Sequence, residues 1–305
     1  MNKIDLTNFT FIIPAKIESE SRKRNAKIVL NFLDTHLDTN IMIYEAGSKI
    51  IPSLIDIDRD NFHYFHEDIL EGEPFHRTKY LNFMLKRVNT KYTVNYDMDV
   101  ILPLETFVNA PSTIEAHNID ILYPYGNSSH SQKKVKQLPL DSYLKKDSEF
   151  YKDLNLFFEI MDSGVPAAAY AGHCQIIKTV CYIKAGMEDE NFISWGPEDR
   201  ERISRFSRLG YKVGHLAKHT VYHLEHARGG DSAESNKWFA NNEKLFYKIG
   251  DMSIYEYLEY IENSKKNLGA DLDIREGIIN RLLEPAGIKD SNHSFETLTT
   301  EKSVP

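Results

Sequence analysis

Two aspartates separated by one residue, Asp97 and Asp99, follow the apolar-rich run YTVNY. Residues at positions i and i+2 point to the same side of an extended strand, so the sequence predicts that both carboxylates face one site. Acids at the end of a buried strand are costly unless something positive meets them. A divalent cation with bound phosphate is such a partner, because hard cations bind carboxylate and phosphate oxygens together. The alternative is a solvated strand end, and the spacing alone does not decide between the two.

The segment WGPED contains a second pair of acids, Glu198 and Asp199, shortly after Trp195. Pro197 favours a helix start here, and negative charge in the first turn is stabilised by the helix dipole. This structural explanation accounts for the acids but not for the tryptophan. A carboxylate beside an aromatic ring is a common arrangement for holding a sugar, and the carboxylate can also accept a proton from an attacking hydroxyl.

A basic and aromatic stretch, PFHRTKYLN at 74–82, precedes the first acid pair by one helix. Arg77 and Lys79 could meet a diphosphate, and Phe75 or His76 could stack on a base. The alternative is an ordinary helix start, with Pro74 near the first turn and the charges facing solvent.

The segment YHLEH offers two histidines, His223 and His226. A separation of three predicts that they point to opposite faces of a strand, so that only one serves a given site. An imidazole with acids and phosphate oxygens makes a suitable Mn²⁺ site, and we select His223 for it. The alternative is a histidine without a metal. The spacing differs from the H-E-x-x-H of zinc proteases.

An alternation of strands and helices must position these residues. Apolar runs at 9–15, 40–48 and 91–103 predict buried strands, and helical spacing at 21–37 and 77–88 predicts helices between them. This order is typical of an α/β domain with a mostly parallel sheet, in which ligands gather at the carboxyl ends of the strands. For the remaining chain we predict a polar surface loop at 123–139, helices at 148–164, 200–213 and after 236, and strands at 167–179 and 219–226.

The composition limits the class of protein. The chain has 305 residues, of which 41% are apolar, and a net charge of -8 that argues against nucleic acid as a partner. The two cysteines cannot form a disulfide framework, which favours a reduced intracellular setting. The first apolar run is too short for a signal peptide, and no stretch approaches a transmembrane span. We therefore expect a cytoplasmic protein; peripheral contact with the inner face of a membrane is compatible with the sequence.

The order of the motifs resembles that of the GT-A glycosyltransferases. The blocks FHRTKYLN, YDMD, AGHCQIIK, GMEDENFISWGPEDRERISRFSRLGYKV and VYHLEH are most similar to animal beta-1,4-galactosyltransferases and to the transferase domains of bacterial chondroitin polymerases. The resemblance implies an α/β GT-A nucleotide-diphospho-sugar transferase fold over 1–230, with a mostly parallel central sheet flanked by helices. We expect a helical C-terminal extension packed on it at 231–290 and a disordered tail at 291–305.

The resemblance also implies roles for individual residues. Asp97 approaches the ribose, Asp99 ligates Mn²⁺ or Mg²⁺, and His223 is the histidine ligand. Glu198 binds sugar hydroxyls and Asp199 is the general base. The other implied contacts, to the nucleotide, the donor sugar and the acceptor, come from Pro14, Phe75, Arg77, Gly172, His173 and Trp195. Because this chain departs from the family pattern after the first strand, Glu45 at the end of the second strand is a further candidate nucleotide contact. Pro14 begins Pro-Ala-Lys, where the galactosyltransferases have a Pro-Phe-Arg type sequence, and His173 is a bulky neighbour of the donor sugar.

These roles imply a metal-dependent inverting glycosyltransferase. It would move a hexose or N-acetylhexosamine, with galactose or GalNAc favoured, from a UDP-sugar to a glycan or lipid-linked glycan in bacterial surface polysaccharide synthesis. One alternative is a retaining enzyme, although related retaining GalNAc-transferases often carry Asn at the position of Asp199. Another is a nucleotidyltransferase, which usually has a Gly-rich loop that IPAKIESESRKR lacks. The third is an inactive module that binds a nucleotide sugar or a glycan.

Overall fold

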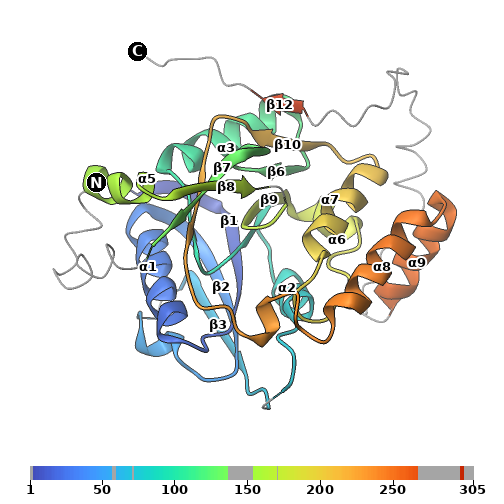
Figure 1. The fold of residues 1–305 in the computed structure, drawn as a ribbon. Helices are drawn as coiled ribbons and strands as arrows, with labels where there is room; N and C mark the ends of the chain where they lie inside the picture. The colour runs from blue at the N-terminus through green and yellow to red at the C-terminus, as the bar shows by residue number, and fades with distance from the viewer. Residues whose placement is uncertain are drawn as a thin grey trace.

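The computed structural model describes residues 3–56, 60–70, 72–136, 154–169, 171–266 and 296–298. Within these residues the strands form two sheets (Figure 1). The larger sheet has the order β12-β10-β6-β9-β4-β1-β2-β3. Its strands are β1 (Ile4–Ala15), β2 (Leu37–Ala46), β3 (Phe62–Glu67), β4 (Tyr92–Tyr96), β6 (Ile121–Tyr123), β9 (Cys174–Lys178), β10 (Val213–Leu216) and β12 (Glu296–Leu298).

The larger sheet is mostly parallel, as the sequence predicts. β1 pairs in parallel with β2 and β4, while β9 runs antiparallel between β4 and β6. Helix α2 (Arg77–Leu85) packs on β1 and β2, and helix α1 (Glu20–His36) packs on β2. The apolar face predicted for α1 is buried, and so is the apolar run of β1, because both belong to the same core.

The smaller sheet has the order β5-β11-β7-β8. Its strands are β5 (Val100–Ile101), β7 (Ser128–Val135), β8 (Val165–Ala169) and β11 (Val221–Leu224). The antiparallel pairing of β5 with β11 places Val100 opposite His223. In addition, the backbone N–H of Leu224 donates to the carbonyl oxygen of Asp99 at 2.8 Å. The smaller sheet therefore brings the YDMD segment next to the YHLEH segment.

Three predicted elements differ from the structure. The strand predicted at 91–103 is two strands, β4 and β5, in different sheets, and residues 97–99 form the turn between them. The surface loop predicted at 123–139 contains β7. Its sequence, SSHSQKKV, is mostly polar and lacks the apolar alternation that predicts a strand. The strand predicted at 167–179 is also two strands, β8 and β9, divided around Gly172. In each case the chain changes sheets, which apolar periodicity does not reveal.

The remaining helices lie on the second half of the chain, apart from α3. Their bounds are α3 (Leu104–His117), α5 (Leu154–Asp162), α6 (Thr179–Lys184), α7 (Glu198–Arg208), α8 (Phe239–Asp251) and α9 (Ile254–Lys266), with short 3-10 turns at Ile51–Ser53 and Gly230–Ser232. The predicted helices at 200–213 and after 236 are confirmed as α7, α8 and α9, and that at 148–164 is confirmed where it is described, as α5. The chain from 267 to 295 and from 299 onward lies outside the described residues.

Helices α8 and α9 lie beside α7 (Figure 1). The hydroxyl of Tyr257 on α9 donates to Glu201 on α7 at 2.8 Å, and both side chains are buried. Trp195, just before α7, stacks on Phe239 of α8 with ring centroids 5.4 Å apart. The C-terminal helices thus support the loop that carries the WGPED motif. Among the described helices, none has the length and apolarity needed to cross a membrane.

Candidate functional site

A cavity of about 310 Å³ lies where the two sheets meet α2 and the start of α7. Its size is at the lower end of the range for small-molecule sites. Every predicted site residue except Glu45 lines it: Pro14, Phe75, Arg77, Asp97, Asp99, Gly172, His173, Trp195, Glu198, Asp199 and His223. The fold therefore brings together motifs that lie more than one hundred residues apart in the sequence.

Glu45 is fully buried and does not line this cavity. Its carboxylate accepts hydrogen bonds from the backbone N–H groups of Ile50 and Ile51, at 3.0 and 3.1 Å, and from the hydroxyl of Tyr64 at 2.6 Å. These partners satisfy the first N–H groups of the short 3-10 turn that follows β2. The structure therefore gives Glu45 a structural role and does not place it as a nucleotide contact.

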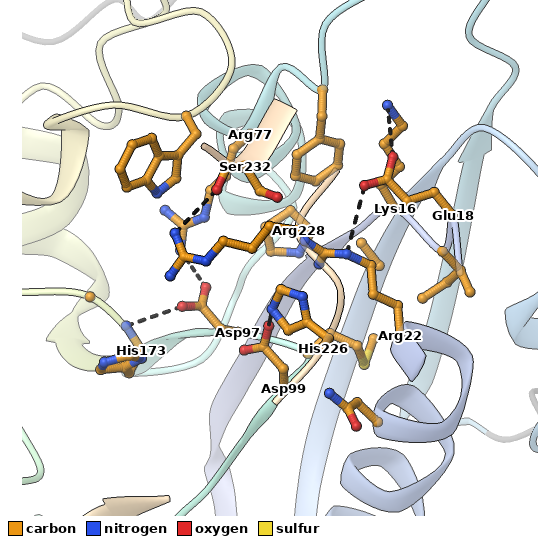
Figure 2. Close-up of a pocket in the computed structure, with 18 of the residues that line it drawn as sticks. Lys16, Glu18, Arg22, Arg77, Asp97, Asp99, His173, His226, Arg228 and Ser232 are labelled. Carbon is orange, nitrogen blue, oxygen red and sulfur yellow. Dashed lines mark hydrogen bonds and ion pairs between the residues drawn. The ribbon is translucent and has the colours of Figure 1, made fainter. Parts of the chain in front are cut away.

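Asp97 is held by two neighbours (Figure 2). Arg77 donates from Nη2 to Asp97 Oδ1 at 2.7 Å, and the backbone N–H of His173 donates to Oδ2 at 3.1 Å. His173 has a positive φ of 70°, a strained conformation for a residue other than glycine. His173 is held in this conformation by Asp97, because its N–H donates to the Asp97 carboxylate and its carbonyl oxygen accepts from the Asp97 backbone N–H at 2.9 Å.

Asp99 lies beside both histidines of the YHLEH segment. Its Oδ2 is 2.9 Å from His226 Nε2, and its Oδ1 is 3.8 Å from His223 Nε2. One carboxylate oxygen of Asp99 and one ring nitrogen from each of His223 and His226 all lie within 4.8 Å of one another. The prediction that only one histidine serves the site is wrong, because β11 ends at Leu224 and strand alternation no longer applies at His226.

The three side chains fit a divalent cation. The Nδ1–H of His226 donates to the carbonyl oxygen of Ala227 at 2.9 Å, so Nε2 is the ring nitrogen that faces Asp99. Burial lowers the pKa of His223, so its ring is neutral at pH 7 and able to bind a metal. Imidazole nitrogen suits Mn²⁺ better than Mg²⁺, which prefers oxygen ligands. Asp99, His223 and His226 are therefore a candidate manganese site.

Asp199 lies between two arginines. Arg202 donates from Nη1 to Asp199 Oδ1 at 2.7 Å, and Arg77 donates from Nη1 to the same oxygen at 3.3 Å. Burial acts to raise the pKa of Asp199, but the two guanidinium groups outweigh it and hold the pKa below its usual range. Asp199 is consequently ionised at neutral pH. Gly172 approaches it closely, since a β-carbon there would lie 3.3 Å from Asp199 Oδ2.

Glu198, in contrast to Asp199, is mostly protonated at neutral pH. Burial, together with the charge of Asp199, raises the pKa of Glu198 to about 8. Its Oε2 accepts a hydrogen bond from the backbone N–H of Gly196 at 3.0 Å. At neutral pH the Glu198–Asp199 pair thus contains one protonated and one ionised carboxyl group, as expected if one acts as a hydrogen-bond donor and the other as a base.

Glu198→Gln should change how stability depends on pH. In the wild type, the stability contributed by protonated Glu198 is fully present below the ordinary pKa of 4.5 and is lost as the pH rises through about 8. Glutamine does not titrate and so does not lose this stability. The melting temperature of the variant minus that of the wild type should therefore be at least about 2 °C larger at pH 9 than at pH 6. Thermal unfolding at several pH values measures this. Parallel curves for the two proteins would show that Glu198 titrates normally.

The loop before α7 is fixed by α8. Asn242 on α8 donates to the carbonyl oxygens of Ile193 and Trp195, at 2.7 and 3.3 Å. Ser194 has a φ of 62° and is buried. A β-carbon at Gly196 would lie 2.7 Å from the Asn242 amide, so the close packing requires glycine there. Trp195 is consequently held at the edge of the cavity.

Several cavity residues were missed by the sequence analysis. They are Ala15, Lys16, Ile17, Glu18, Arg22, Asn25, Met98, Ser194, His226, Arg228 and Ser232. Arg202, which donates to Asp199, was also missed. Its side chain is fully buried, and it pairs with Glu188 through Nε and Nη2, each at 2.6 Å. The spacing of three between Asp199 and Arg202 on a helix is a signal that could have found this pair.

No protein-family model matches the chain, and no curated protein sequence matches it. Solved structures do. GalNAc-T7, solved with UDP, GalNAc and Mn²⁺, is 13% identical with a TM-score of 0.55, over 90% of this chain and 53% of that one. TarS of S. aureus is 14% identical with a TM-score of 0.48, over 90% and 43%. Drosophila beta-1,4-galactosyltransferase 7, solved with manganese, UDP-Gal and xylobiose, is 12% identical with a TM-score of 0.47, over 78% of each chain.

The similarity to GalNAc-T7 confirms the predicted fold. At 13% identity it shows a shared GT-A architecture and nothing finer. The other two TM-scores are below 0.5, so they add no weight to this conclusion.

Proposed function

We propose that this chain is a metal-dependent inverting glycosyltransferase that transfers a hexose or N-acetylhexosamine from a UDP-sugar to a hydroxyl group of a glycan or lipid-linked glycan. The observation that carries the proposal is one cavity in which a metal-ligand group, Asp99 with His223 and His226, lies together with the Glu198 and Asp199 pair. The ligands named for GalNAc-T7, which are UDP, GalNAc and Mn²⁺, agree with a UDP-sugar donor and a divalent metal.

The donor end of the site is formed by the metal ligands and Arg77. A cation bound by Asp99, His223 and His226 would offset the charge that develops on the leaving diphosphate. Arg77 would orient the diphosphate, and Asp97, already bonded to Arg77, would approach the ribose. Phe75 and Pro14 complete this end of the cavity. Gly172 leaves space for the donor sugar, and His173 borders that space.

The acceptor end is formed by the WGPED motif. Trp195 would support the acceptor sugar, and protonated Glu198 would donate a hydrogen bond to a sugar oxygen. Asp199 would take the proton from the attacking hydroxyl on the side opposite the leaving group, which inverts the anomeric carbon. A diphosphate that draws Arg77 away would leave Asp199 with Arg202 alone, and the carboxylate would then be a stronger base.

We further propose galactose or GalNAc as the sugar and the synthesis of a bacterial surface polysaccharide as the process. Both rest on the sequence resemblance to galactosyltransferases and chondroitin polymerases. A cytoplasmic location is supported by the two cysteines, Cys174 and Cys181, which are buried and not joined in a disulfide, as in reduced proteins. An inverting rather than retaining reaction is supported by the acid at position 199, which lies within the cavity and is ionised.

A donor screen separates the candidate activities. We expect the protein to release UDP from one or a few UDP-sugars in the presence of Mn²⁺. A nucleotidyltransferase would instead release pyrophosphate when supplied with UTP and a sugar phosphate. A binding module would bind UDP-sugars, as seen by calorimetry, without releasing UDP. Either of the last two results would contradict the proposal.

A further inference from the structure

A second cavity, of about 460 Å³, adjoins the metal-ligand group. Three residues line both cavities: His223, His226 and Arg228. The remaining walls of the second cavity are Lys134, Lys136, Glu225 and Ala227. Three permanent cations therefore face one acid here, although the chain as a whole carries a net charge of -8. The second cavity is thus suited to an anion.

The lysines of this cavity follow from the alternation of β7. Lys133 points to one face of the sheet, where its Nζ pairs with Asp162 at 2.6 Å. Lys134 points to the other face, in register with His223 on the parallel strand β11. Lys134 and Lys136 are both exposed, and among the described residues neither has an ion-pair partner. Their ammonium groups are therefore available to a ligand.

Arg228 connects the second cavity to the WGPED motif. Its guanidinium carbon lies 6.0 Å from the centroid of the Trp195 ring, and Nη1 donates to the carbonyl oxygen of Ser232 at 3.2 Å. Figure 2 shows Arg228 among the residues that line the first cavity. A sugar resting on Trp195 would therefore meet Arg228, and beyond it the two lysines.

We propose that the second cavity binds a phosphate group carried by the acceptor, so that the acceptor is a phosphorylated glycan. This inference rests on the proposed function, because it takes Trp195 as the acceptor platform. A phosphate monoester carries about -1.5 to -2 charges at pH 7, and arginine and lysine bind it through charge-assisted hydrogen bonds. A neutral glycan would leave Lys134 and Lys136 without a partner.

Calorimetry with simple probes tests the inference. The protein is first saturated with UDP and Mn²⁺, and then titrated with N-acetylglucosamine 6-phosphate, N-acetylglucosamine 1-phosphate, N-acetylglucosamine or inorganic phosphate. We expect one of the sugar phosphates to bind at least about tenfold more tightly than the neutral sugar and than inorganic phosphate. The double variant Lys134→Gln/Lys136→Gln should lose that advantage. Lys244→Gln/Lys248→Gln, on α8 and outside both cavities, removes the same charge and should leave it unchanged.

Three results would overturn the inference. In the first, the neutral sugar binds as tightly as both sugar phosphates. In the second, the two double variants lose the same affinity for the sugar phosphate. In the third, inorganic phosphate binds as tightly as the sugar phosphates, which would indicate a site for free phosphate. The preceding UDP titration separates this failure from failure of the proposed function. If UDP binds with Mn²⁺ and no sugar phosphate is preferred, only the acceptor assignment is wrong. If UDP does not bind, the proposed function is wrong as well.

Discussion

We expect Asp199→Asn to lower the rate of sugar transfer by at least about 100-fold and to leave the affinity for UDP within about twofold. General bases typically contribute factors of 10² to 10⁴, and an amide cannot take up the proton of the attacking hydroxyl. Asparagine retains an oxygen that can accept the hydrogen bonds of Arg77 and Arg202, so the arrangement of the cavity should persist. UDP release under saturating donor measures the rate, and calorimetry measures the affinity.

The control for this variant is Asp34→Asn. Asp34 forms a surface ion pair with Lys3 and lines neither cavity, so the same chemical change there should leave the rate unaltered. An Asp199→Asn protein with nearly normal turnover would contradict the assignment of Asp199 as the base. A loss of turnover accompanied by an equal loss of UDP affinity would indicate a binding role instead.

We expect Asp99→Ala to abolish the effect of Mn²⁺ on UDP binding. In the wild type, UDP should bind at least about tenfold more tightly with Mn²⁺ than with EDTA, because the bound cation would meet both the protein ligands and the diphosphate. Removing the carboxylate leaves only the two imidazoles, His223 and His226. Calorimetric titrations of UDP with and without Mn²⁺ should then give the same affinity in the variant.

The histidines extend this prediction. His223→Ala and His226→Ala should each weaken the effect of Mn²⁺ on UDP binding. If the two histidines pointed to opposite faces of a strand, only one of these substitutions would weaken it. His130→Ala is the matched control, because His130 lies on β7, is exposed, and lines neither cavity. A Mn²⁺ effect that survives in Asp99→Ala would contradict the metal site. An effect that is lost in His130→Ala would show that the loss is not specific.

The sequence is sufficient to predict the architecture and most of the cavity. Apolar spacing located β1, α1, β2 and α2, because each of these elements buries one continuous face in a shared core. The motif order then placed the acids and aromatic residues at the ends of those elements. The prediction worked at these positions because site residues at strand ends and helix starts depend on local sequence.

The parts that could not be predicted depend on contacts between distant segments. His226 reaches Asp99 only because the chain turns after Leu224, and Glu45 is used internally because residues 50 and 51 fold back on it. Lys134 belongs to a strand whose partner, β11, lies some ninety residues later, and its polar sequence has the character of a loop. Hydrophobic periodicity contains no information about such pairings.

Release of UDP from UDP-galactose and UDP-GalNAc, followed with excess Mn²⁺ and after chelation with EDTA, tests the central claim most directly. If the cavity is a metal-dependent glycosyltransferase site, UDP should appear with Mn²⁺ from at least one of these donors, and release should fall at least about tenfold after chelation and return when Mn²⁺ is restored. Release that is equally fast with EDTA, or no release from either donor although UDP binds, would contradict it.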